Sequence, residues 1–308
     1  MKKPSFLLNA LLWIVAFVLM AAAVIYQRST GPTYPMRGEI TVEGQEWKYR
    51  LVRSEETTRP AQVVLPSPPT GVQATLHWRR YPTQDEFTAT VLAYDAGVEV
   101  DKLDTTGGLV ADLPKQPAAG KLEYYLEVVA SGESLRIPEV TSETVKGEEN
   151  IVLRYKDPVP GNVLWPHIIF MMLSFLVGMR AFLAAIVDPI NMRKLAWTTL
   201  FCLTIGGMVL GPIVQKYAFG HYWTGFPYGS DLTDNKHLIQ WIVWILACGV
   251  IGFKAKPKEG VGRGVVAIAA VVMIGVYLIP HSMRGSELNY EALDQGVDPT
   301  AAIGTGEK

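Results

Sequence analysis

Residues 216–237 read KYAFGHYWTGFPYGSDLTDNKH and join two long apolar runs near the C-terminal end of the chain. The stretch holds six aromatic residues besides two histidines, three glycines and one proline, and it ends in a dense polar cluster. No other part of the sequence places so many potentially reactive side chains between two apolar segments. We therefore expect the rest of the chain to hold this loop at one face of a lipid bilayer.

The composition predicts a membrane protein with one sizeable domain outside the bilayer. Of its 308 residues, 49 % are hydrophobic and only 19 % are charged, against about 25 % charged in a typical soluble protein. The apolar residues are concentrated in 5–26 and 163–281, whereas 27–162 and 283–308 are polar. A net charge of −1 argues against nucleic acid as a partner, because nucleic-acid-binding proteins carry a basic surface.

Five apolar segments come close to the ~20 residues that a helix needs to cross the hydrocarbon core. They are residues 5–26, 163–187, 195–215, 237–253 and 264–280. The alanines at 21–23 resemble a signal-peptide cleavage site, but the apolar run is longer than a signal peptide requires and continues past them. An uncleaved anchor is therefore the favoured interpretation of the first segment.

These segments divide the chain into four parts. We expect a transmembrane anchor at 1–26, an exported β-sandwich domain at 27–162, a four-helix transmembrane bundle at 163–282 with its outer loop at 216–237, and a disordered acidic tail at 283–308. The lysines and arginines of the short loops gather at 2–3, 193–194 and 254–263, which all fall on one side if there are five spans. The positive-inside rule makes that side cytoplasmic and places the β domain and the C-terminus outside.

The exported segment is expected to be all β. It contains nine short runs rich in β-branched or aromatic residues, separated by turn residues, and most of these runs alternate apolar and polar positions. They are Glu39–Val42, Glu46–Val52, Gln62–Leu65, Val72–Arg80, Phe87–Tyr94, Leu109–Leu113, Lys121–Val129, Ser134–Ile137 and Ile151–Tyr155. Seven to nine strands at this spacing favour a sandwich over a barrel.

Within this segment, residues 109–133 read LVADLPKQPAAGKLEYYLEVVASGE. The stretch resembles the late strands of bacterial immunoglobulin-like or fibronectin-III-like extracytoplasmic domains, in which a proline-rich corner leads into a strand with paired tyrosines, here Tyr124 and Tyr125. The resemblance covers about residues 60–158. It implies a fold and no activity.

Four of the five histidines are expected at the outer membrane face: His167, His221, His237 and His281. Imidazoles that converge there could bind a transition metal or the iron of a haem. The alternative is that each histidine is an interfacial residue at a helix end. No pair has the i, i+4 spacing of a helical metal site, and HExxH does not occur.

The polar end of the outer loop supplies further candidate site residues. Asp231, Asp234 and Asn235 could ligate a cation or position a proton, and Lys236 belongs to the same polar cluster. Trp223 lies in a glycine-rich aromatic run that could form a pocket. The simpler interpretation is that Thr233 or Asp234 caps the following helix and that the aromatic residues form an interfacial belt. Capping leaves Asp231 and Lys236 without a role.

The loop and its preceding residues, GPIVQKYAFGHYWTGFPYGSDLTDNKH, resemble a bacterial integral-membrane family without an assigned activity. In general character they are also similar to the tryptophan-rich outer loops of haem-handling membrane proteins, although the WWD-type run of those proteins is absent here. The resemblance to a bacterial family implies the inner membrane of a bacterium. In that membrane, the orientation given by the positive-inside rule makes the N-terminus cytoplasmic and the β domain periplasmic.

The sequence thus predicts a membrane α-helical bundle of five transmembrane helices with an all-β immunoglobulin-like sandwich domain. The leading functional hypothesis is an accessory or structural subunit, anchored in lipid, that binds a protein partner through its β domain. The alternative is a redox protein that holds haem or a transition metal at the outer histidines. An enzyme is disfavoured; its weaker form would use Asp231, Asp234 and a histidine as acid and base on lipid headgroups.

Overall fold

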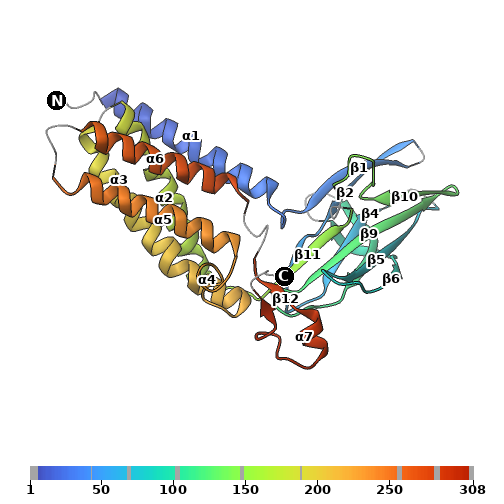
Figure 1. The fold of residues 1–308 in the computed structure, drawn as a ribbon. Coiled ribbons are helices and arrows are strands. Elements are labelled where there is room, and N and C mark those ends of the chain that lie inside the picture. Colours follow the sequence, from blue (N-terminus) through green and yellow to red (C-terminus); the bar gives the residue numbers. More distant parts are fainter. Residues whose placement is uncertain are drawn as a thin grey trace. The chain divides into compact units, whose positions relative to one another are not determined.

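The computed structural model describes residues 6–42, 44–67, 71–100, 105–145, 149–187, 189–254, 259–280 and 285–304. These residues form two compact units, one helical and one β (Figure 1). The chain enters the β unit at Pro32 and leaves it after Pro158. It then builds most of the helical unit and returns to the β unit at Ser286.

Within these described residues, the helical unit contains four helices that are long and apolar enough to cross a membrane: Phe6–Ser29, Gly161–Ile186, Met192–Phe219 and Gly260–Leu278. The first, second and fourth correspond to α1 (Phe6–Thr30), α2 (Gly161–Ile186) and α6 (Gly260–Leu278). The third consists of three consecutive helical elements: α3 (Met192–Leu203), a π-helical segment η2 (Thr204–Leu210) and α4 (Gly211–Phe219). A short 3₁₀ turn, η1 (Pro189–Asn191), precedes it.

The remaining predicted span corresponds to α5 (Leu232–Ile251), which is less apolar than the other four helices. Its first turns carry Asp234, Asn235 and Lys236, and the apolar run begins only at Leu238. The second half of α5 nevertheless belongs to the main core, since Trp244 and Cys248 are fully buried there with residues of α1, α2, α3 and α6. The α5 helix is therefore an integral member of the bundle.

The β unit is built from two open sheets that do not close into a barrel. Its eleven main strands are β1 (Met36–Val42), β2 (Gln45–Leu51), β3 (Ser54–Glu56), β4 (Ala61–Pro66), β5 (Gln73–Arg80), β6 (Thr88–Val91), β7 (Ala93–Val100), β8 (Thr105–Leu113), β9 (Lys121–Ala130), β10 (Glu133–Ile137) and β11 (Ile151–Lys156). One sheet has the order β3-β11-β9-β5-β6, with β10 also paired to β9, and the other has the order β4-β8-β7. The β1–β2 hairpin forms a separate ribbon.

A single hydrophobic core joins the two sheets. Alternation along β9 places Leu122, Tyr124 and Leu126 in this core together with Leu65 and Leu113 of the second sheet. All nine sequence-predicted runs overlap observed strands. The run predicted at 87–94 divides into β6 and β7 at Leu92. This residue is 5 % exposed and its N–H donates to the Ala74 carbonyl, so the chain passes here from one sheet to the other.

The C-terminal segment folds where its composition predicts disorder. Strand β12 (Glu287–Leu288), helix α7 (Tyr290–Asp294) and strand β13 (Ile303–Gly304) all belong to the β unit. Leu288, Tyr290 and Ile303 are buried, so these apolar residues anchor an otherwise acidic and glycine-rich stretch. The predicted disorder of 283–308 is therefore wrong for residues 286–304, and residues 283–284 and 305–308 lie outside the described residues.

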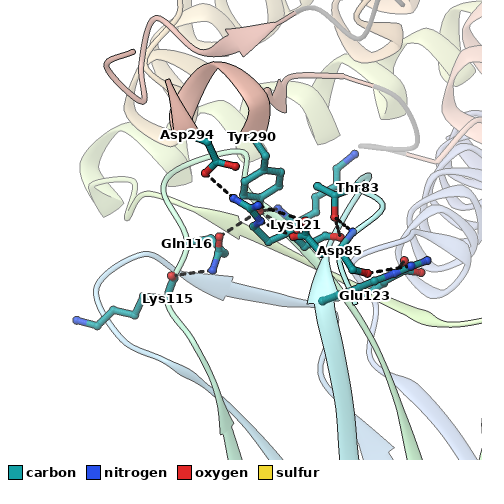
Figure 2. A network of polar contacts seen from close by, with 10 residues as sticks. Thr83, Asp85, Lys115, Gln116, Lys121, Glu123, Tyr290 and Asp294 are labelled. Atoms are coloured by element: carbon teal, nitrogen blue, oxygen red, sulfur yellow. Dashed lines mark hydrogen bonds and ion pairs between the residues drawn. The ribbon is translucent and has the colours of Figure 1, made fainter. Parts of the chain in front are cut away.

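Tyr290 is the main polar anchor of this segment (Figure 2). Its hydroxyl donates to the Lys121 carbonyl at 2.8 Å and accepts from the Lys121 N–H at 3.0 Å. Arg80 lies over the Tyr290 ring, 5.1 Å from its centroid, and donates to both Asp85 and Asp294. These contacts join helix α7 to the end of β5 and the start of β9, which lie far from α7 in the sequence.

Candidate functional site

The outer loop is held by the carboxylates that the sequence marks as candidate site residues. Asp231 is the N-cap of α5, and its Oδ1 accepts hydrogen bonds from the backbone N–H groups of Thr233 at 2.8 Å and Asp234 at 3.3 Å. The N-cap is therefore Asp231, whereas we expected Thr233 or Asp234 from the sequence. An acidic cap also complements the positive end of the helix dipole.

Asp234 fastens the loop to the start of α5. Its Oδ2 accepts from the backbone N–H groups of Thr224 at 2.7 Å and Gly225 at 3.0 Å. A Cβ on Gly225 would lie 2.6 Å from the Asp234 Cβ, so only glycine permits this close approach. Gln215 of α4 donates to the Thr224 hydroxyl at 2.6 Å, which completes a partly buried polar link between α4 and α5.

The other polar candidates bind backbone groups as well. Asn235 Oδ1 accepts from the Phe226 N–H at 2.6 Å. Lys236 is 4 % exposed and its Nζ donates to the carbonyls of Ile279 at 2.6 Å and Pro280 at 3.2 Å, which ties α5 to the end of α6. The Trp223 indole donates to the Phe226 carbonyl at 3.0 Å. The predicted site residues of the loop thus come together, but they bind one another and the backbone.

Several aromatic rings of this end of the unit point into the surroundings. Tyr222, Phe226 and Tyr228 are 59 %, 69 % and 76 % exposed, and Trp165 at the start of α2 is 63 % exposed. Amphipathic rings with this exposure near helix ends are typical of a membrane–water interface. The structure therefore favours the interfacial-belt interpretation of these aromatic residues.

His167 and His237 converge on the π-helical segment η2. The His167 Nδ1 lies 2.8 Å from the Gly206 carbonyl. The His237 ring lies against Gly207, where a Cβ would overlap the imidazole, and its Nδ1 lies 2.7 Å from Gln240 Nε2. The rings thus contact adjacent glycines of one helix from two other helices. Single-turn π-helical segments are often found at functional sites.

Of the four candidate histidines, the structure brings His167 and His237 together at η2. His221 lies half-buried in the loop after α4, and His281 lies outside the described residues. Within the described ranges, no group of three or more His, Cys, Asp or Glu side chains is arranged to hold a metal ion. His167 and His237 serve helix packing, since each has one ring nitrogen bonded within the bundle and His237 is pressed onto Gly207.

A second candidate site, which the sequence analysis did not single out, lies on the outward face of the larger sheet of the β unit. Tyr125 of β9 stacks on His77 of β5, with ring centroids 4.6 Å apart and an interplanar angle of 5°. The Arg136 guanidinium lies over the same Tyr125 ring, 4.3 Å from its centroid, and Phe87 meets its edge at 5.3 Å. Arg79 in turn lies 4.5 Å from the Phe87 centroid. We call His77, Arg79, Phe87, Tyr125 and Arg136 the Tyr125 cluster.

Polar contacts fix the geometry of the Tyr125 cluster. Arg79 pairs with Glu123 at 2.5 Å, and Arg136 donates to Asn150 at 2.6 Å. His77 Nε2 lies 3.3 Å from Glu127 Oε2. Hydrogen bonds from the Ser134 hydroxyl and from His77 hold the pKa of the exposed Glu127 carboxyl below its usual value. The cluster is thus preorganised by charged and hydrogen-bonding neighbours.

The strand register could have revealed this cluster. Buried Tyr124 and outward Tyr125 follow from simple alternation along β9, and His77 lies directly opposite Tyr125 in the β5–β9 pairing. Phe87 and Arg136 could not be placed beside them without the fold, because they come from the segment before β6 and from the β9–β10 hairpin.

No protein-family model matches this chain, and no curated protein matches it. Its function therefore has to be inferred from the geometry of these sites.

Proposed function

We propose that this protein is a polytopic inner-membrane protein of a bacterium that serves as an accessory or structural subunit and binds a protein partner through its exported β unit. The Tyr125 cluster is the observation that carries the proposal. Tyrosine, arginine and phenylalanine are enriched at protein–protein interfaces and supply much of their binding energy. A rigid, partly exposed stack of these residue types is a suitable anchor for such an interface.

The surroundings of the cluster resemble an interface rim. Val129 and Val91 are 41 % and 70 % exposed on β9 and the edge strand β6. The Glu127 side chain is 44 % exposed beside them. The cluster therefore offers aromatic and aliphatic contact area bordered by charged groups, which is the usual composition of a non-obligate interface. An immunoglobulin-like sandwich, which we take the two open sheets to represent, is a fold that commonly presents such surfaces.

The proposed topology has five spans, with α5 as the fourth. The lysines and arginines of the short loops then gather on the cytoplasmic side, and the β unit and outer loop lie outside. The polar first turns of α5 would lie at the outer interface, where Asp231 and Asp234 are satisfied by the loop. Interfacial rings such as Tyr228 and Trp165 support the same placement.

Site-specific photocrosslinking in native membranes tests the proposal. A benzophenone amino acid at Tyr125 of the full-length protein should yield a discrete crosslinked product with another polypeptide. The matched control is the same probe at Tyr94, an exposed residue of the opposite sheet, which should yield none. If Tyr125 gives no product and the detergent-extracted protein is recovered alone, the proposed role is refuted.

The geometry supports the redox alternative less well. His167 and His237 approach the same helix, but their rings contact its backbone and Gln240. The lipid-headgroup enzyme is also less well supported, because Asp231 and Asp234 are occupied as acceptors for loop amides. An absorbance spectrum and metal analysis of the purified protein would test the first alternative directly, since a bound haem or stoichiometric metal would overturn our preference.

A further inference from the structure

The inner face of α5 carries a row of buried polar side chains. His237, Gln240 and Trp244 follow one another at spacings of three and four residues, so they lie on one side of the helix. They are 8 %, 1 % and 0 % exposed. The row runs from the polar start of α5 toward the middle of a helix that we place in the membrane.

Each of these three side chains has a buried polar atom without a hydrogen-bond partner among the described residues: His237 Nε2, Gln240 Oε1 and Trp244 Nε1. Gln240 uses its other amide atom for the His237 ring, at 2.7 Å. A flip of the Gln240 amide would place Oε1 at the His237 ring and leave Nε2 without a partner instead. His237 Nε2 lies near the Leu203 carbonyl, but it does not reach hydrogen-bond geometry with it.

The neighbouring Trp241 shows that an indole in this bundle can be fully satisfied. Its Nε1 donates to the Thr204 hydroxyl at 3.0 Å, and that hydroxyl donates to the Leu200 carbonyl at 2.8 Å. Trp244 lies beside Gly178 of α2, where a Cβ would approach its Cζ2 to 3.4 Å. Two hydroxyls in the same interior, Ser174 and Thr199, are fully buried and donate to carbonyls of their own helices.

Unpaired polar atoms in a helical bundle require an explanation. Most buried polar side-chain atoms of proteins have a partner, and those without a protein partner commonly bind ordered water. In lipid the cost of an unpaired group is higher because the surroundings offer no alternative partner. Polar residues that face the interior of a membrane bundle accordingly tend to mark sites or pathways for polar molecules.

We propose that the α5 face formed by His237, Gln240 and Trp244 is an intramembrane binding site for a small uncharged ligand that carries a hydroxyl group. The ligand oxygen accepts from the Trp244 indole, and a ligand hydroxyl donates to Gln240. Water has this chemistry, and so does the headgroup region of a neutral lipid. The proposal does not depend on a protein partner for the β unit.

Solid-state NMR of the full-length protein in lipid bilayers tests this site directly. With ¹⁵N-labelled indoles, assigned by Trp244→Phe and Trp241→Phe, the Trp244 N–H should resonate in the hydrogen-bonded range, as the Trp241 N–H does. Magnetisation transfer from water protons to Trp244 would identify the ligand as water. A hydrogen-bonded Trp244 without that transfer, together with transfer from lipid protons, would identify a lipid oxygen. A Trp244 resonance at the frequency of an unbonded indole would overturn the proposal.

An isosteric substitution gives an independent measurement. Benzothienylalanine replaces the indole N–H by sulfur and keeps the shape of the ring. At Trp244 it should lower the thermal unfolding midpoint in detergent by about 2–4 °C, as it should at Trp241, whose bond to Thr204 is visible. If Trp241→benzothienylalanine lowers the midpoint while Trp244→benzothienylalanine leaves it unchanged or raises it, the N–H has no ligand and the proposed site does not exist.

Discussion

Replacing Tyr290 by phenylalanine should loosen the C-terminal segment without disturbing the rest of the β unit. Tyr290 is 3 % exposed, and its hydroxyl is bonded to both the N–H and the carbonyl of Lys121. Phenylalanine would keep the buried ring and its contact with Arg80. The substitution therefore isolates the hydroxyl. The Lys121 N–H loses its partner, whereas the Lys121 carbonyl keeps a hydrogen bond from the Tyr81 N–H at 3.0 Å.

The size of the effect follows from the unpaired Lys121 N–H. Leaving a buried donor or acceptor unpaired costs about 1–3 kcal/mol. Lys121 begins strand β9, where water can reach the backbone once the segment opens slightly. We therefore take about 2 kcal/mol for this N–H, below the upper end of that range. Because about 1.4 kcal/mol corresponds to a factor of ten, the opening equilibrium should shift about 30-fold.

Amide hydrogen exchange of the full-length protein in nanodiscs measures this shift. The Asn289 N–H is bonded to the Ala302 carbonyl at 2.9 Å and reports on closure of the segment. Its exchange should accelerate about 30-fold in Tyr290→Phe, whereas amides of β5 should be unchanged. Tyr94→Phe, at an exposed tyrosine of β7, serves as the control. Wild-type exchange at Asn289 in Tyr290→Phe would refute the assigned role of this hydroxyl.

Three further predictions concern other contacts. Gly207→Ala should destabilise the helical unit by about 1–3 kcal/mol through overpacking against His237. The control, Gly211→Ala, should be nearly neutral, because its Cβ would meet no atom closer than 3.7 Å. Equal unfolding midpoints for the two variants would contradict this packing. Asp234→Ala should leave the backbone N–H groups of Thr224 and Gly225 unpaired, at a cost of about 1–3 kcal/mol each, and expose the loop to protease. Asp234→Asn retains an acceptor, so protease should cleave it more slowly than Asp234→Ala. Hydrogen bonds from Arg80 hold the pKa of the Asp85 and Asp294 carboxyls below the usual value of about 3.9. Because the pKa of each carboxyl is lower in the folded than in the unfolded protein, ionisation stabilises the fold above about pH 4. This stabilisation is lost as pH falls through the lowered pKa. Asn289 exchange should therefore differ between wild type and Asp294→Asn at pH 6 and converge near pH 2, and a constant difference would exclude the ion pair as the cause.

The sequence was most informative where a residue's environment depends on its local pattern. Four long apolar runs are membrane-length helices, and each of the nine alternating runs overlaps a strand. Pattern alone was insufficient where distant segments meet. The C-terminal stretch was predicted to be disordered because acidic and glycine residues dominate it. Its few apolar residues, Leu288, Tyr290 and Ile303, are nevertheless buried against a surface that the strands create.

The candidate site was predictable in composition but not in role. The loop residues Asp231, Asp234 and Asn235 do cluster, yet their acceptors are directed to backbone amides, a distinction that only the path of the loop reveals. The π-helical segment at 204–210 has no sequence signature beyond the adjacent glycines 206 and 207. The Tyr125 cluster combines residues from four separate segments, so local spacing could not have identified it.

The return of the chain to the β unit at Ser286 has a consequence for biosynthesis. Residues 159–285 are made after the first part of the β unit and before its last part. At about 5–20 residues per second, these 127 residues delay completion of the β unit by roughly 6–25 s. During that interval Tyr290 does not yet cover the surface around Lys121, which gives a chaperone a defined time window and a defined patch to protect.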